Sequence, residues 1–345
     1  MTVFVTGASG FLGTALVRRL IADGAEVRCL VRDASKAQAL KESLGPEARG
    51  RLRIVLGALG TVDPLMQALK GVDIVYHVAA AMRGATAVLF LNNVVASREL
   101  VRACSLARVG RFVLVSSIAV YGTYALREFD TVDETCPLDS QSHRRDPYTF
   151  SKVAEESAVR EEALAAGLPL TVVRPGVIYG PGRGCLSARV GLQLGNMVLR
   201  MGGQQKLCYT FVENCARAVA LAGTVPAAAG EVFNVVDNDP PTSCGLLKQY
   251  RKSVGGLRIY PVPHWAIGPL SRACEWYHRK SRGQLPAVLT PYISGSIWKR
   301  LHYSNAKARQ VLRWEPEVGF QEGLRRTFQW LNAQRRAALA RPGAV

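Results

Sequence analysis

The sequence lacks several features that would place the protein in a specialised class. Its eight cysteines form no CxxC pair and no Cys/His cluster at metal-ligand spacing, so we expect reduced thiols and no metal site. No apolar run approaches the roughly 20 residues that a membrane-spanning helix needs. The opening residues MTVFVTGASG have no basic stretch before an apolar run, so we expect no secretory signal. We therefore expect a globular, cytoplasmic protein.

Acidic residues are scarce relative to basic ones. The chain holds 44 Lys and Arg against 26 Asp and Glu, a net charge of +18. From Ser271 onward there are 14 basic residues and 4 glutamates. Such a surplus suits an anionic ligand, an anionic membrane surface or nucleic acid. No nucleic-acid-binding motif accompanies the charge, so we predict no nucleic-acid partner and regard a solvated basic face as the plainer interpretation.

The first half of the chain alternates between two hydrophobic periods. Runs rich in β-branched residues predict strands, and runs with apolar residues three and four apart predict helices. The predicted strands are 3–6, 26–31, 53–56, 73–80, 111–117 and 168–175, and the predicted helices are 11–24, 34–44, 86–107 and 148–167. This alternation predicts an α/β fold with a Rossmann-type, doubly wound parallel sheet.

The character of the sequence changes after Pro175. Residues 176–184, GVIYGPGRG, are predicted to form a loop, and later elements are irregularly spaced. The predicted domains are a dinucleotide-binding domain at 1–175, to which a strand at 231–236 returns, a substrate-binding lobe at 176–230 and 237–335, and a flexible tail at 336–345.

A glycine-rich turn, TGASGFLG, joins the first predicted strand to its helix. Gly7 permits the tight turn, Gly10 lets the backbone approach a pyrophosphate, and Gly13 allows the helix to pack closely on the strand. The amide groups at the start of the helix favour an anion. The predicted cofactor site here comprises Gly7, Ser9, Gly10, Phe11, Leu12 and Gly13.

The residues after the second strand bear on the choice of dinucleotide. An acidic side chain at the strand end would hold the ribose of NAD, but the sequence reads CLVRD, with Arg32 first. The planar guanidinium of Arg32 suits a 2′-phosphate, so we predict that NADP is preferred and NAD is possible. The alternative is that Arg32 is a surface residue beside Asp33, which caps the next helix.

The pentapeptide YTFSK places Tyr148 and Lys152 four residues apart at the start of a helix. Side chains at this spacing share a helix face, so the ammonium group can approach the phenol. A positive charge there favours the phenolate and lowers the pKa of Tyr148. Such a phenol can exchange a proton with an alcohol.

Read together, TGASGFLG, SSIAVYG and YTFSK resemble the extended short-chain dehydrogenase/reductase family, the NAD(P)-dependent epimerase/dehydratase group. Further segments, in order, are DIVYHVAA, RPGVIYGPG, YTFVENCARAVALA and YSNAKARQVLRWEP, so the resemblance covers nearly the whole chain. The sequence looks closer to the branch with 3β-hydroxysteroid dehydrogenases and dihydroflavonol reductases.

The resemblance implies roles for individual residues. It makes Tyr148 the general acid/base, Lys152 the group that holds the nicotinamide ribose and modulates Tyr148, and Ser117 the hydroxyl that polarises the reacting oxygen. Ser116 is ranked below Ser117 as a structural neighbour. The remaining implied positions are Ala79 and Ala80 beside the cofactor, Asn93 on a helix near the site, and Pro175, Gly176 and Val177 over the nicotinamide.

Three positions depart from patterns of the family. Dehydratases carry an Asp-Glu pair after the serine, where this chain has Ile118 and Ala119, so we do not expect a dehydratase. Gly176 stands where many sugar-nucleotide epimerases have asparagine. Ala58 replaces an aspartate that contacts adenine in relatives.

These observations predict an oxidoreductase that transfers hydride between nicotinamide C4 and a secondary alcohol or ketone. The alternatives are a nucleotide-sugar epimerase with bound NAD, and a non-catalytic dinucleotide sensor or scaffold. Relatives commonly dimerise through two helices, so we expect a homodimer through 86–107 and 148–166.

The segment 261–290 mixes aromatic and basic residues. It suits a lip over a hydrophobic substrate, or peripheral contact with an anionic membrane. The plainer interpretation is a helix that packs its aromatic side chains on the core. His77, His143 and His264 have no sequence partners that suggest metal or nucleophilic chemistry.

Overall fold

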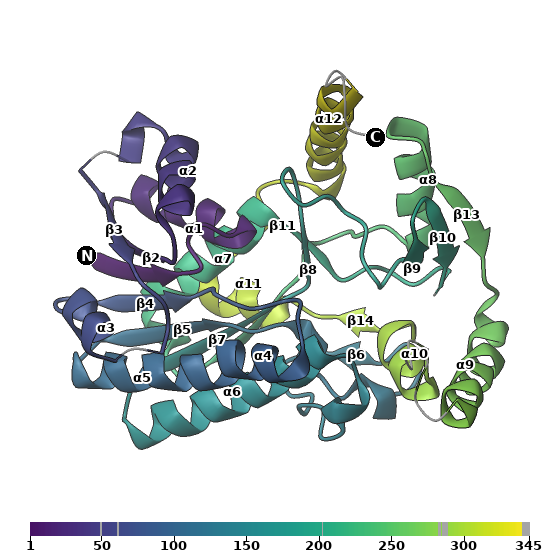
Figure 1. Ribbon diagram of the computed structural model, residues 1–345, viewed down its shortest axis with the longest axis horizontal. Helices are drawn as coiled ribbons and strands as arrows, with labels where there is room; N and C mark the ends of the chain where they lie inside the picture. The colour runs from purple at the N-terminus through teal and green to yellow at the C-terminus, as the bar shows by residue number, and fades with distance from the viewer. Residues whose placement is uncertain (49, 61, 202, 282–283, 285–288, 340–345) are drawn as a thin grey trace.

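The computed structural model describes residues 1–48, 50–60, 62–201, 203–281, 284 and 289–339. Its main element is a seven-stranded parallel sheet in the order β12-β7-β5-β4-β1-β2-β3 (Figure 1). The strands are β1 (Thr2–Thr6), β2 (Glu26–Val31), β3 (Leu52–Leu56), β4 (Ile74–His77), β5 (Arg111–Val115), β7 (Leu170–Pro175) and β12 (Val232–Val235). The order reverses beside β1, as in doubly wound dinucleotide-binding sheets, so the predicted fold class is confirmed.

Helices cover both faces of this sheet because its strands are apolar on both sides. Along β1, Val3 and Val5 pack toward one face, while Phe4 packs toward the other. The first face is covered by α1 (Phe11–Ala22), α2 (Ala34–Leu44) and α7 (Val212–Thr224). The second face is covered by α3 (Val62–Leu69), α5 (Ala96–Leu106) and α6 (Pro147–Ala165).

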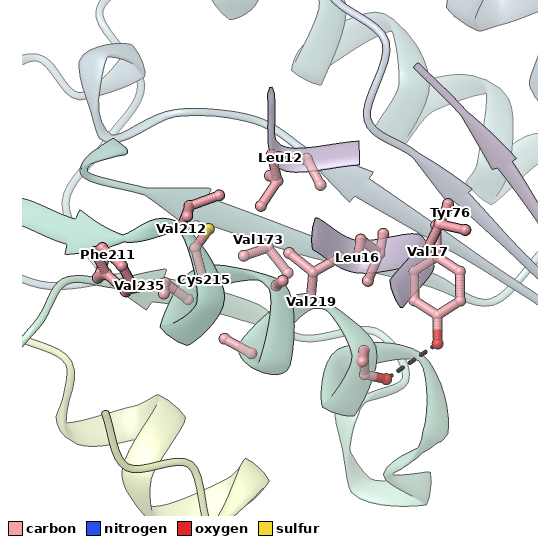
Figure 2. Close-up of a cluster of buried hydrophobic side chains, with 14 of the residues drawn as sticks. Leu12, Leu16, Val17, Tyr76, Val173, Phe211, Val212, Cys215, Val219 and Val235 are labelled. Carbon is pink, nitrogen blue, oxygen red and sulfur yellow. Dashed lines mark hydrogen bonds between the residues drawn. The ribbon is translucent and has the colours of Figure 1, made fainter. Parts of the chain in front are cut away.

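Helix α7 belongs to the sheet half of the molecule. It lies inside residues 176–230, which we assigned to the substrate-binding lobe, but it packs on α1 and the sheet (Figure 2). Val219 of α7 and Leu16 of α1 are both fully buried there. The Tyr76 hydroxyl donates a hydrogen bond of 3.0 Å to the Ala220 carbonyl and ties α7 to β4.

The helix predicted at 86–107 is interrupted. It consists of α4 (Thr86–Phe90), one π-helical turn, η2 (Leu91–Val95), and α5. Single π turns inside α-helices are frequent at functional sites. The turn contains Asn93, whose side chain binds a loop beside the predicted cofactor site.

The smaller lobe consists of short sheets and peripheral helices (Figure 1). Its elements are β9 (Gly191–Leu194), β10 (Met197–Arg200), β13 (Arg258–Pro261), α8 (Ser243–Ser253), α9 (His264–Lys280) and α10 (Pro291–Ile297). Two separate parallel pairs complete the sheets: β8 (Val177–Tyr179) with β11 (Tyr209–Phe211), and β6 (Thr131–Val132) with β14 (His302–Tyr303). Residues 176–184, which we predicted to be a loop, therefore contain a strand.

The chain ends in two further helices, α11 (Ala306–Leu312) and α12 (Phe320–Leu339). Helix α11 packs on β12 and α7. Helix α12 extends four residues into the tail that we predicted at 336–345, and residues 340–345 lie outside the described part of the chain. No helix among the described residues is long and apolar enough to cross a bilayer.

Candidate active site

A cavity of about 710 Å³ opens beyond the carboxyl ends of β1, β4, β5 and β7. Ligands of doubly wound sheets bind at this edge. All the residues predicted for the site line it, namely Gly7, Ser9, Gly10, Phe11, Leu12, Gly13, Arg32, Ala79, Ala80, Ser117, Tyr148, Lys152, Pro175, Gly176 and Val177. The structure therefore brings together residues from six separate segments of the sequence.

The glycine turn has the geometry of an anion cradle. Gly7 has φ +67°, a conformation that glycine adopts without strain, and its carbonyl accepts a 2.9 Å hydrogen bond from the Gly10 amide. A Cβ atom on Gly13 would lie 2.0 Å from that carbonyl oxygen, so only glycine lets α1 pack this closely. No side chain caps the start of α1, which leaves first-turn amides for an anion. These residues fit the pyrophosphate of a dinucleotide.

The end of the cavity beside β2, where we predicted the adenosine of the cofactor, has a basic rim. Arg32 and Lys36 both line it and are exposed. The carboxylate of Asp33 accepts hydrogen bonds from the Lys36 amide, at 2.9 Å, and from the Ser35 hydroxyl, at 2.7 Å. These bonds lower the pKa of Asp33 to about 2. Asp33 thus caps α2, as the alternative interpretation expected, while Arg32 faces the cavity.

Lys152 is buried at the other end, with a side chain only 1% exposed. Its ammonium group donates a 3.0 Å hydrogen bond to the Val115 carbonyl at the end of β5, and it forms an ion pair with Glu155. Burial alone would lower the pKa of Lys152, but the charge of Glu155 raises it above the ordinary value. The Glu155 carboxylate therefore keeps this buried lysine charged.

Glu155 connects Lys152 to a buried polar network. The Ser97 hydroxyl of α5 donates to Glu155 at 3.2 Å, and His77 Nε2 lies 2.7 Å from the same hydroxyl and 3.6 Å from Glu155. His77 Nδ1 lies 2.7 Å from the hydroxyl of Thr6 in β1. Glu155 was not among the residues predicted for the site. Its only signal in the sequence is its position three residues after Lys152, which places the two side chains on one helix face.

The pKa of Tyr148 differs from our expectation. Burial raises the pKa of Tyr148, and the charge of Lys152 lowers it by less, so the net pKa lies above the ordinary value. The predicted effect of Lys152 has the right sign but does not dominate. Tyr148 is therefore a protonated phenol at neutral pH and is suited to donate a proton.

The two adjacent serines after β5 have different partners. Ser116 is buried and donates a 2.6 Å hydrogen bond to Glu156, which also binds Arg174. Ser117 begins a short 3₁₀ turn, where its oxygen accepts from the Ala119 amide at 3.1 Å, and it lines the cavity. Ser116 lines the cavity too, but its hydroxyl is already engaged with Glu156.

Two further residues fix the backbone around the cavity. Asn93 accepts from the Ala81 amide at 2.7 Å and donates to its carbonyl at 3.0 Å, which holds the loop after β4 in place. A Cβ atom on Gly176 would lie 2.3 Å from the Cys208 carbonyl oxygen. The close approach of that backbone leaves room only for glycine at this position.

Sequence analysis also missed two arginines at the substrate end of the cavity. Arg145 precedes α6, Arg189 precedes β9, and both line the cavity with buried side chains. Neither belongs to a recognisable motif, so the sequence carried no signal for them. Within the described part of the chain, no three His, Cys, Asp or Glu side chains gather as a metal site would require.

Comparison with known proteins identifies the family. A family model, the NAD dependent epimerase/dehydratase family, matches residues 3–235. The chain belongs to this family, which is the one that its motifs resemble. It is therefore an NAD(P)-dependent oxidoreductase of the extended short-chain dehydrogenase/reductase type.

Individual relatives agree with this assignment. The chain is 28% identical to a 2-alkyl-3-oxoalkanoate reductase of Stenotrophomonas maltophilia, over 94% of this chain and 98% of the relative. It is 28% identical to a 3-beta-hydroxysteroid dehydrogenase of Mycolicibacterium neoaurum, over 91% and 87% of the two chains. The structure of UDP-glucuronic acid 4-epimerase from Bacillus cereus in complex with NAD shares the fold, with a TM-score of 0.73 at 19% identity over 99% of each chain.

Proposed function

We propose that the protein interconverts a ketone and a secondary alcohol, with Tyr148 as proton donor and acceptor. The observation that carries this proposal is the convergence of Tyr148, Ser117 and Lys152 on the cavity that also contains the glycine turn. The relative from Stenotrophomonas is named as a reductase of oxoalkanoates, which is the same class of reaction.

Each residue of the site has a separate role in the proposed reaction. The bound nicotinamide supplies or accepts the hydride at its C4 atom. Tyr148, protonated at neutral pH, donates a proton to the carbonyl oxygen during reduction, and the Ser117 hydroxyl hydrogen-bonds the same oxygen. Lys152, kept charged by Glu155, favours the phenolate that remains. General acid/base help of this kind contributes about 10² to 10⁴-fold in rate.

NADP is the proposed cofactor. Arg32 lines the adenosine end and has no ion pair with another described residue, so its guanidinium is available for a 2′-phosphate. Asp33 is engaged as the cap of α2 and is therefore not free to bind a ribose. NAD remains the second choice.

Product analysis tests the reaction against its rivals. Incubation with ketones should consume NADPH and yield an equal amount of alcohol. Isomerisation of a nucleotide sugar without net cofactor turnover would instead support an epimerase with bound NAD. Binding of NADPH without turnover of any ketone, alcohol or nucleotide sugar would support a sensor or scaffold, although the retained Tyr148 and Lys152 argue against it.

We also propose an oligomeric state and a cellular location for the protein. We infer a homodimer through helices 86–107 and 148–166, because α4 to α6 expose Val88, Leu91, Val95, Leu106 and Leu164. Glutamate in place of Leu91, which is 60% exposed, should shift the sedimentation coefficient toward that of a monomer. A cytoplasmic location also remains a proposal.

Helix α9 gives a reason to test membrane contact. Trp265, Trp276 and Tyr277 are 78%, 61% and 58% exposed, so they do not pack on the core as the plainer interpretation expected. Basic residues, including Arg272 and Arg279, lie on the same helix, and such a helix suits an anionic surface. No described α9 residue lines the cavity, and residues 282–283 and 285–288 of the predicted segment lie outside the described chain. Sedimentation with anionic vesicles at physiological salt tests this contact.

A further inference from the structure

Arg189 is an unusual charged group because it is buried without an acidic partner. The residue is 8% exposed and lines the cavity. Its guanidinium donates one hydrogen bond, of 3.1 Å, to the Tyr303 hydroxyl and lies over the Tyr303 ring at 5.2 Å from the centroid. Among the described residues, no carboxylate lies within ion-pair distance of it. A buried guanidinium without a counter-charge is costly unless a ligand supplies one.

A second guanidinium, that of Arg145, lines the same cavity. The side chain of Arg145 is 3% exposed, and its Nε atom is buried without a hydrogen-bond partner. Burial lowers the pKa of Arg145, and the positive charge of Arg189 lowers it further. Arg145 also donates a 2.9 Å hydrogen bond to the Ala119 carbonyl, two residues after Ser117. Arg145 therefore lies close to the serine proposed to contact the reacting oxygen.

The two guanidinium groups differ in their compensation. Asp139, whose side chain is 1% exposed, lies 3.5 Å from Arg145. The Tyr292 hydroxyl donates to the other oxygen of Asp139 at 2.5 Å, which keeps the carboxylate in place. Asp146 also lines the cavity, and its charge acts on Arg145 as well. Arg145 is therefore compensated within the protein, whereas a ligand carboxylate would supply the counter-charge that Arg189 lacks.

We propose that Arg189, with Arg145 in the wall of the same cavity, binds a carboxylate of the substrate, so that the substrate is a keto acid or hydroxy acid rather than a neutral ketone. This inference rests on the proposed function and specifies its substrate class. The lining of the cavity also includes apolar side chains, among them Ile118, Ile178 and Ile297, and these suit the hydrocarbon part of such an acid. A planar guanidinium that binds a carboxylate through two hydrogen bonds would also fix the direction in which the carbonyl points.

A matched pair of substrates tests the proposal. A freshly prepared β-keto acid of medium chain length and its methyl ester differ mainly in charge, and NADPH oxidation reports on both. The wild-type protein should favour the acid, and Arg189→Met should lower kcat/KM for the acid on the order of 10²-fold while changing the ester little. Arg189→Lys keeps the charge but loses the planar fork. Its kcat/KM for the acid should therefore lie between those of the wild type and Arg189→Met.

The control variant is Arg272→Met, which removes an exposed charge of α9 outside the cavity and should leave both substrates unchanged. Equal losses for acid and ester in Arg189→Met, or a wild-type preference for the ester, would overturn the inference while leaving ketone reduction intact. A melting temperature near that of the wild type, measured for each variant, shows that the variant folds.

Binding separates failure of the inference from failure of the proposed function. If neither compound is reduced, the saturated fatty acid and its methyl ester are compared by thermal shift with NADP present. Stabilisation by the acid alone, abolished in Arg189→Met, would retain the carboxylate subsite although ketone reduction had failed. No difference between acid and ester would reject the subsite.

Discussion

The two ends of the cavity carry positive charge in opposite environments. At the adenosine end, Arg32 is exposed and lies where water and salt reach it. At the substrate end, Arg189 and Lys152 are buried, at 8% and 1% exposure. Exposed charges are screened within about 8 Å at physiological salt, whereas buried charges are costly unless a fixed partner or a ligand compensates them. Under the proposed function, the exposed end would adjust cofactor preference and the buried end would set which chemistry occurs.

Two adjacent glutamates of α6 compensate different buried charges. Glu155 and Glu156 are adjacent in α6, and both are fully buried. Glu155 pairs with Lys152 in the cavity wall, whereas Glu156 pairs with Arg174, 2.5 Å away, behind it. The first pair sets the charge of Lys152, which lines the site, whereas Glu156 reaches the cavity wall only through its hydrogen bond from Ser116. The comparison predicts that neutralising these two carboxylates will have different consequences, on catalysis and on stability.

The largest effect that we expect comes from Tyr148→Phe. Removal of the hydroxyl eliminates the proton donor at the buried end, so kcat should fall by about 10² to 10⁴-fold. The dissociation constant of NADPH should change little, because the cofactor contacts at the exposed end remain. Steady-state kinetics and a fluorescence titration measure the two quantities. Unchanged turnover would remove Tyr148 from the mechanism.

Glu155→Gln should have the next largest effect, and it should depend on pH. Without the Glu155 charge, burial lowers the pKa of Lys152, so the ammonium loses its proton at a lower pH than in the wild type. We expect kcat to fall about tenfold or more at alkaline pH and to recover as the pH is lowered.

The control for this variant is Glu162→Gln. Glu162 lies on the same helix but pairs with Arg102, at 2.9 Å and outside the cavity. The pH dependence of kcat in Glu162→Gln should match that of the wild type. If the profile of Glu155→Gln also matched, the charge of Lys152 would not depend on Glu155.

Arg32→Ala should have a smaller and more selective effect. Loss of an exposed guanidinium should weaken NADP binding about tenfold and leave NAD binding nearly unchanged, because only NADP has the 2′-phosphate. Titration with both dinucleotides measures the ratio. Equal weakening of the two would contradict the assignment of Arg32.

Salt should produce the smallest effect and should separate the two ends directly. Between about 0.05 M and about 0.5 M salt, NADP binding should weaken by a few fold because Arg32 and Lys36 are exposed. The preference for a keto acid over its ester should stay nearly constant, because Arg189 is buried. A preference that fell as steeply as NADP affinity would place the substrate charge at an exposed site instead.

Local sequence patterns determined the sheet half of the molecule and its glycine turn. The predicted segments 26–31 and 34–44 coincide with β2 and α2, because a short apolar run along a strand and a capping aspartate at a helix start are local properties. Gly7 and Gly13 were identifiable because no other residue tolerates their backbone conformation or close contacts. Tyr148 and Lys152 were identifiable because a spacing of four fixes their common face.

Only the tertiary structure decided which distant segments meet. Contact between Glu155, Ser97 and His77 depends on how α6 and α5 pack against β4, and contact between Arg189 and Tyr303 joins residues 114 positions apart. The parallel pairing of β8 with β11 has the same origin. Such contacts follow from the burial of whole faces and the compensation of buried charge, and neither leaves a periodic signal in the sequence. For that reason the sequence determined the class of chemistry, while the three-dimensional arrangement indicates the charge of the substrate.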